Sequence, residues 1–297
     1  MHEDIYLFLH IPRTGGTSVE HSISYYGDRT NDRFLKHYNY VQNFSESKYD
    51  ELNIPRLSFR SLEQQKKLIL LSGHSVFCNS HRWLRIKRTP KIFSVIRNPI
   101  ERILSSFNYR YTKEVLCQDK QAFSSNNPPM DEWAVRQQKS SSDYETLYQY
   151  YEDVHFEHNL QCKWLIKSFV TNINNTWQPH PEYVFGPDVG LQKDDAIPMT
   201  WPSWMYLDND TIDWYKFAKN FFEKIWWLTT TKSLDLSIPA FCEHTRLDYT
   251  PTRMNTSEIK RWTHDEVMNQ PDIDKLIKAE RHDMKLFETA ERWIRPF

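Results

Sequence analysis

The stretch HIPRTGGTS at residues 10–18 lies between an apolar run and a helix-like one. It contains five consecutive residues that are glycines or carry a single hydroxyl: Thr14, Gly15, Gly16, Thr17 and Ser18. A tight loop between a strand and a helix exposes consecutive N–H groups at the positive end of the helix dipole. Arg13 adds a permanent charge and a planar fork suited to phosphate or sulfate oxygens. The stretch predicts an anion cradle, or a helix N-cap at Thr17 or Ser18 as the purely structural alternative.

Two further candidates follow other predicted strands. Arg97 ends the apolar run KIFSVI at 91–96, and Ser105 lies in the helix-like stretch after it, which suggests a second anion site. His74, in LLSGHSVF, follows an apolar run at 68–71. Ligands of open α/β sheets bind at the carboxyl ends of strands, so these side chains are expected along one edge.

Strands that alternate with helices predict a single α/β domain over residues 1–297, with a central parallel sheet flanked by helices. The expected strands are residues 4–10, 68–71, 91–96 and 225–230. The expected helices are a short one before residue 68, residues 17–26, one beginning at Pro99, residues 144–169, 211–224 and 272–294. Residues 27–60 look irregular, and two insertions are expected at about 118–142 and 174–210.

Composition narrows the function classes. Lys and Arg number 38 against 39 Asp and Glu, a formal net charge of −1, which argues against a general nucleic-acid binder. The cysteines at 78, 117, 162 and 242 form no zinc pattern, so free thiols in a reducing compartment are expected. No apolar stretch reaches the ~18 residues that span a bilayer, and no signal peptide is recognisable, so we expect a soluble, cytoplasmic protein.

Five segments carry a resemblance to a known family. HIPRTGGTS resembles the 5′-phosphosulfate-binding loop of sulfotransferases that use 3′-phosphoadenosine 5′-phosphosulfate (PAPS). VIRNPIERILSSFNYRY resembles their 3′-phosphate-binding segment, with Arg97 and Ser105 at the family's positions. SGHSVF resembles the G-H element of the carbohydrate branch, which includes the uronyl and heparan sulfate 2-O-sulfotransferases. ERHDMKLFETAERW resembles the closing helix of that branch, and IWWLTTTKSL stands in the place of its late strand.

The resemblance implies a P-loop-like three-layer fold, PAPS as sulfuryl donor, no metal, and a hydroxyl of a carbohydrate as acceptor. His74 would take the acceptor's proton, a task for which the ordinary imidazole pKa of about 6.5 is suited. Arg13 and the N–H groups from Thr14 to Ser18 would hold the 5′-phosphosulfate, and Arg97 with Ser105 would hold the 3′-phosphate.

The acceptor side is less specific. The basic stretch HRWLRIKRTPK at 81–91 is expected either to face an anionic glycan or to be a solvated surface. Trp201 and Trp204 are candidates for stacking on sugar rings, with core packing as the alternative. Arg253 falls where the family has a loop that closes over the nucleotide.

The chain departs from the family at two positions. Arg13 stands where the family usually has Lys, and Ser72 stands where close relatives carry a second histidine. Two other functions therefore stay open. A nucleotide-dependent phosphotransferase could use the same cradle, although the pattern G-x-x-x-x-G-K-[ST] is absent. A catalytically degenerate nucleotide-binding protein is the other.

Overall fold

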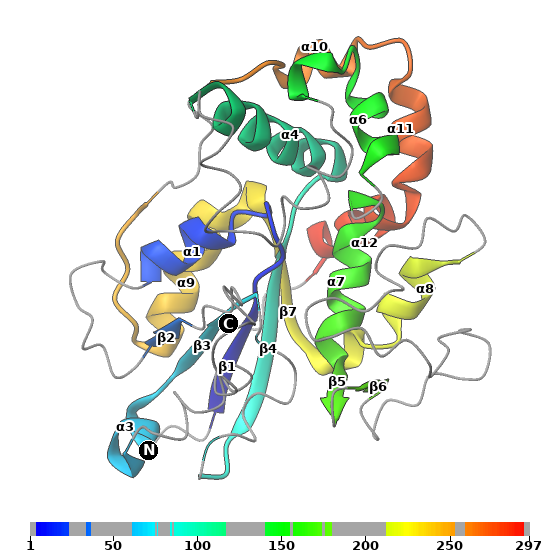
Figure 1. Ribbon diagram of the computed structural model, residues 1–297. Helices are drawn as coiled ribbons and strands as arrows, with labels where there is room; N and C mark the ends of the chain where they lie inside the picture. Colours follow the sequence, from blue (N-terminus) through cyan, green and yellow to red (C-terminus); the bar gives the residue numbers. More distant parts are fainter. Residues whose placement is uncertain are drawn as a thin grey trace, which may run out of the picture.

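Five parallel strands form the central sheet of the molecule (Figure 1). The computed structural model describes residues 4–23, 34–36, 61–74, 76, 84, 86–116, 140–154, 157–173, 176–179, 212–252 and 259–293. In spatial order the strands are β2 (Phe34–Lys36), β3 (Leu70–Gly73), β1 (Asp4–Leu9), β4 (Thr89–Ile96) and β7 (Ile225–Thr230). Each neighbouring pair is parallel, so the carboxyl ends of all five strands lie at one edge. The expected α/β fold with a central parallel sheet is confirmed.

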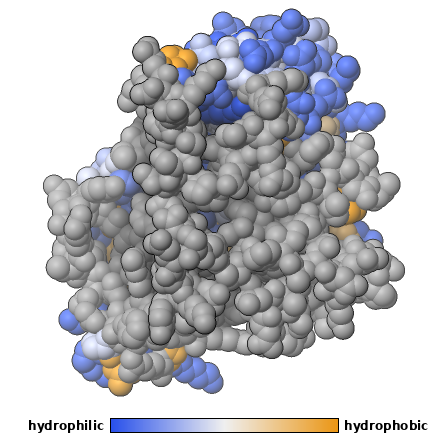
Figure 2. Space-filling view, viewed as in Figure 1, coloured by the Kyte–Doolittle hydropathy of each residue, from blue (hydrophilic) through white to orange (hydrophobic). Residues whose placement is uncertain are grey.

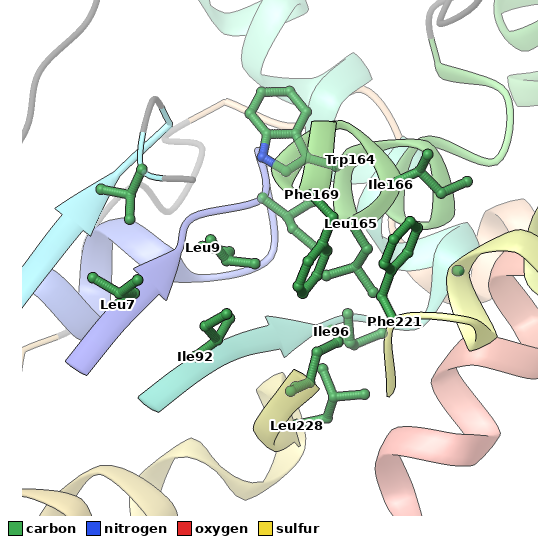
Figure 3. Packing of buried hydrophobic residues seen from close by; sticks show 14 of the residues in the cluster. Leu7, Leu9, Ile92, Ile96, Trp164, Leu165, Ile166, Phe169, Phe221 and Leu228 are labelled. Atoms are coloured by element: carbon green, nitrogen blue, oxygen red, sulfur yellow. The ribbon is translucent and has the colours of Figure 1, made fainter. Parts of the chain in front are cut away.

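Alternate residues of β1 face opposite layers, because successive side chains of a strand point to opposite sides of a sheet. Leu7 and Leu9 belong to a buried cluster with three helices, α7 (Leu160–Phe169), α8 (Trp214–Lys219) and α12 (Arg281–Glu291). Figure 3 shows Leu165 and Phe169 of α7 close to Leu9 of β1 and to Ile96 in the neighbouring strand.

The other face of the sheet carries a second cluster. There Tyr6 and Phe8 of β1 pack with α1 (Gly16–Ile23) and α9 (Leu234–Thr245). A three-layer arrangement of helix, sheet and helix follows from these two clusters.

A third group of helices lies beyond the carboxyl edge of the sheet (Figure 1). It consists of α4 (Pro99–Leu116), α6 (Leu147–Asp153), α10 (His264–Met268) and α11 (Ile273–Ala279). Their buried residues form one cluster, while their outer surface in Figure 2 is mostly hydrophilic. Asn98 caps α4, since its Oδ1 accepts from the N–H groups of Ile100 at 3.0 Å and Glu101 at 3.3 Å. The group carries Ser105 to the edge where the strands end.

The expected strands are present, with boundaries that differ from the prediction by at most two residues. β1 occupies residues 4–9, β3 residues 70–73 rather than 68–71, and β4 residues 89–96 rather than 91–96. β7 occupies 225–230 as predicted. The short helix before residue 68 is α3 (Leu62–Lys67). β2 lies within 27–60, a stretch expected to be irregular, and its strand geometry comes from pairing with β3.

Three long helices predicted from apolar spacing are interrupted in the structure. Residues 144–169 form α6 and α7, separated at Asn159, whose φ of 48° lies in the left-handed region. The described part of 211–224 contains α8 and the 3₁₀ turn η6 (Phe222–Lys224), and the described part of 272–294 contains α11 and α12. An apolar stripe persists across such breaks, so spacing alone overestimates helix length.

Further elements lie outside the predicted set. The 3₁₀ turns η2 (Ser141–Asp143) and η7 (Thr231–Ser233) and the hairpin of β5 (Val170–Ile173) with β6 (Thr176–Pro179) were not predicted, nor was α9. Of the two expected insertions, only 140–142 and 176–179 fall among the described residues. No helix in the described ranges is long and apolar enough to cross a membrane.

Candidate functional site

The predicted cradle is the connection between β1 and α1. Two of its residues, Arg13 with a φ of 64° and Gly15 with a φ of 83°, have left-handed backbone. Left-handed residues alternating with ordinary ones turn successive N–H groups toward one side, which makes an anion-binding concavity. Thr14 is fully buried, and its Oγ1 donates to the carbonyl of Ile11 at 2.9 Å. Its hydroxyl therefore stabilises the shape of the loop from inside.

The adjacent glycines are needed for different reasons. Gly15 has the positive φ, whereas Gly16 lies against the imidazole of His10. A Cβ at Gly16 would come 2.1 Å from Cδ2 and 2.4 Å from Nε2 of His10. Only glycine leaves room for that ring, so the loop and His10 fit each other closely.

His74 follows β3 and contacts the same connection. Its Nδ1 lies 2.8 Å from the carbonyl oxygen of His10, so Nδ1 must donate, and Nε2 of the neutral ring holds the lone pair. The His74 ring centre is 4.0 Å from that of His10, and the edge of Trp164 packs at 5.7 Å between ring centres.

Burial, followed by the neighbouring His10, lowers the pKa of His74 to about 3. The ordinary pKa near 6.5 expected from the sequence is therefore corrected. The cause is the desolvation of the charged ring, which disfavours the imidazolium. His74 is neutral across the physiological range and is ready to accept a proton, but with low affinity for it.

Arg13, Arg97 and Ser105 form one cluster. Nη2 of Arg13 donates to the backbone carbonyl of Ser105 at 3.0 Å and to its Oγ at 3.4 Å. The Arg13 guanidinium also lies 4.3 Å from the ring centre of Tyr109. Nη1 of Arg97 donates to the carbonyl of Arg13 at 3.3 Å. The two anion sites that the sequence suggested separately are in contact.

Arg97 is held on two sides. Its backbone pairs with the Gln161 amide in both directions, N–H to Oε1 at 2.8 Å and Nε2 to the carbonyl at 2.9 Å. Its Nε lies 3.4 Å from Oε2 of Glu101, which is in the first turn of α4. Burial lowers the pKa of both Arg97 and Arg13, although a guanidinium stays charged in proteins.

A buried polar network lies behind His74. Nδ1 of His10 is 3.0 Å from Oε1 of Glu20, and Oγ of Ser72 donates to the same oxygen at 2.5 Å. All three residues are at most 5% exposed. Sequence reasoning did not identify His10 or Glu20 as part of the site. The available signal was the position of His10 directly after the strand.

Other candidates lie elsewhere or outside the described residues. Arg88 precedes β4 and is buried, where its guanidinium donates to the carbonyls of Asp4 and Gln65. Asp4 pairs with Thr89 at the amino end of the sheet, opposite the cradle, so Arg88 is not part of an acceptor surface at this site. His81, Arg82, Arg85, Trp201, Trp204 and Arg253 lie outside the described residues.

Cys162 and Cys242 are buried free thiols, as expected, and burial raises the pKa of both. Cys78 and Cys117 lie outside the described residues. Among the residues that are described, no group of three His, Cys, Asp or Glu side chains is placed to hold a metal ion.

Comparison with known proteins adds no family assignment. No protein-family model matches the chain, and no curated protein matches it.

Proposed function

We propose that the protein transfers a sulfuryl group from PAPS to a hydroxyl of a carbohydrate acceptor, using a P-loop-like cradle. One observation carries this proposal: the connection after β1 touches both other candidate groups. His74 bonds to the carbonyl of His10, and Arg13 bonds to Ser105 and Arg97. A base and two arginines thus surround an anion-binding loop at the edge where α/β proteins bind ligands.

The residues of the site fit the donor. Within the described chain, Nε of Arg13 is buried without a hydrogen-bond partner, so the guanidinium retains a donor for an anion. The N–H groups of Gly15 to Ser18 lie at the start of α1, where the helix dipole is positive. These features support an anionic ligand rather than a neutral one.

Each side chain then has a defined task. When bound, PAPS supplies the sulfuryl group and carries its own leaving phosphate. His74 accepts the hydroxyl proton of the acceptor at Nε2, while its Nδ1 stays hydrogen-bonded to His10. Arg13 and the loop amides stabilise negative charge at the 5′ end, and Arg97 with Ser105 recognises the 3′-phosphate. Positioning and charge stabilisation are the main contributions of the protein.

Ligand selectivity tests the proposal directly. The thermal shift of the purified protein is measured with PAP (3′-phosphoadenosine 5′-phosphate), ADP and ATP at equal concentrations. A ligand at a hundredfold excess over its Kd stabilises the folded state by about 2.7 kcal/mol. A larger shift with PAP than with ADP supports recognition of the 3′-phosphate. A preference for ATP would instead favour a phosphotransferase, and no shift with any nucleotide would favour a degenerate protein.

The role of His74 has its own test. His74→Ala should retain PAP binding, because its side chain contacts His10 and Trp164, whereas the donors proposed for the anion are Arg13 and the loop N–H groups. Transfer of ³⁵S from labelled PAPS to acceptor should fall by at least ~100-fold, the usual contribution of a general base. Unchanged turnover in this variant would remove His74 from the mechanism.

A further inference from the structure

A negative charge lies directly beneath the proposed anion cradle. Glu20 is the fifth residue of α1, is 1% exposed, and points to His10 and Ser72. A carboxylate at this place opposes the binding of an anion at the start of the same helix, because like charges repel. Anion binding alone therefore gives no reason for an acidic residue here.

The contacts connect this carboxylate to His74. His10 Nδ1 and Ser72 Oγ bond to one Glu20 oxygen, at 3.0 Å and 2.5 Å, which holds the carboxylate behind the His10 ring. That ring lies close to both Gly16 and His74, with the two imidazole centres 4.0 Å apart. The carbonyl of His10 fixes Nδ1–H of His74. His10 therefore contacts the loop, the base and Glu20.

Several neighbouring charges shift the pKa of His74, and the charge of Glu20 is one of them. Burial, His10 and the ammonium of Lys167 lower the pKa of His74, whereas the bond to the His10 carbonyl and the charge of Glu20 raise it. Glu20 is 1% exposed, and a buried charge acts with little screening. Glu20 therefore stabilises the imidazolium that a proton transfer to His74 would create.

We propose that Glu20 is a positioning residue whose carboxylate, held by His10 and Ser72, stabilises the protonated form of His74. The inference rests on the proposed function, since it assigns Glu20 to the same proton transfer. This role of Glu20 accounts for an acidic side chain close to the proposed anion-binding loop.

The test variant is Glu20→Gln, which keeps the size of the side chain and removes its charge. Turnover at saturating PAPS should fall about tenfold, the effect of one pKa unit on a base. The Kd for PAP should stay the same or decrease, because a negative charge near the cradle is gone. A merely structural role would instead weaken PAP binding and turnover together, and that outcome would overturn the proposal, as would unchanged turnover.

Ser94→Ala is the matched control. Ser94 is also fully buried, and its hydroxyl donates to the carbonyl of Leu9 at 2.7 Å, so the variant loses a neutral buried bond in β4. Its turnover should remain within about threefold of wild type, since only an uncharged hydrogen bond is removed. A tenfold loss in Ser94→Ala would show that any buried polar defect has the effect seen at Glu20.

A second readout does not need the transfer reaction. Diethyl pyrocarbonate acylates neutral imidazole, and the rate at His74 can be followed by mass spectrometry of its peptide. The rate should be at least threefold slower in Glu20→Gln, because a less basic nitrogen is a weaker nucleophile. If the wild type shows no sulfuryl transfer, this rate still decides the role of Glu20, and equal rates would overturn it.

A second variant covers a failure of Glu20→Gln to fold. Glu20→Asp keeps the charge but withdraws it by one methylene from His10 and Ser72. Both turnover and the acylation rate at His74 should then lie below those of wild type, and unchanged rates would contradict the proposal.

Discussion

At the residue scale, the types of the side chains in the site could be recognised from the sequence, but the contacts between them could not. Arg13, His74 and Arg97 were predicted because each follows an apolar run, and parallel strands end at one edge. Their mutual arrangement depends on two carbonyl groups. The carbonyl of His10 sets the tautomer of His74, and the carbonyl of Arg13 accepts from Arg97. Backbone acceptors carry no residue-type signal, so the sequence could not show these contacts.

The ion pair between Arg97 and Glu101 makes a testable prediction. Glu101 lies 3.4 Å from Nε of Arg97, and both side chains are about one-third exposed. Glu101→Gln should remove a charge that competes with the proposed 3′-phosphate. We expect PAP to bind about two- to fivefold more tightly, in line with the modest energy of exposed pairs, while ADP affinity is unchanged. Isothermal titration with both nucleotides measures this.

Glu114→Gln is a control on the same helix. Glu114 forms a comparable pair with Arg110 at 2.8 Å, about 20 Å farther along α4 at 1.5 Å per residue. It should leave PAP affinity unchanged. Equal tightening of PAP and ADP by Glu101→Gln would contradict a specific role of Arg97 in 3′-phosphate recognition.

At the scale of elements, the break between α6 and α7 shows why helix ends were poorly predicted. The N–H groups of Gln161 and Cys162 bond to the carboxylate of Asp283, each at 2.8 Å. Glu280 accepts from the N–H of Asn159 at 2.6 Å. These caps come from α12 and the residue before it, more than 100 positions away. A local pattern cannot contain them, although the apolar stripe was correctly recognised.

Titration of Glu280 makes the contribution of this junction to the stability of the fold depend on pH. Burial, then the charge of Asp283, raises the pKa of Glu280 to about 8, while Arg102 opposes the rise. In the unfolded chain the carboxyl has its ordinary pKa of about 4.3. The folded state therefore binds a proton that the unfolded state releases. This contribution to stability is complete below pH ~4.3 and is lost as the pH rises through about 8.

Glu280→Gln should remove that dependence. The amide oxygen can still accept from Asn159 and from the hydroxyl of Tyr151, which bonds to the carboxyl at 2.8 Å. We expect the variant to match wild type near pH 5 and to exceed its unfolding free energy at pH 8. Urea unfolding at both pH values measures this, and parallel curves would show that Glu280 does not titrate as described.

At the scale of the whole molecule, one edge of the sheet carries the candidate chemistry. The cradle, His74 and Arg97 all follow carboxyl ends of strands, whereas Arg88 supports the amino end. The basic stretch that contains Arg88 follows the histidine loop in sequence, which suggested a surface near the site. Strand β4 carries the chain back across the sheet between Arg88 and Arg97, so neighbours in sequence lie at opposite ends.

Hydrogen exchange can test whether the nucleotide binds at the carboxyl edge of the sheet. PAP should slow amide exchange in peptides that cover residues 10–20 and 97–106. Peptides from 61–67 and 86–90, at the amino edge, should exchange as before, because they lie away from the cradle. Measurement by mass spectrometry with and without PAP gives both results in one experiment. Protection confined to the amino edge would place the nucleotide elsewhere.

The sequence by itself determined the central strands of the sheet and the strand–loop–helix unit at residues 4–23. It also determined which types of residue lie at the carboxyl ends of these strands. Apolar periodicity and small-residue loops are local properties of the sequence, so they do not depend on how the chain packs. The tertiary structure alone decided that His10 fills the space beside Gly16, that Glu20 bonds to His10 and that burial lowers the pKa of His74. These properties depend on distances between strands β1 and β3 and helix α1, and desolvation exists only once they pack together.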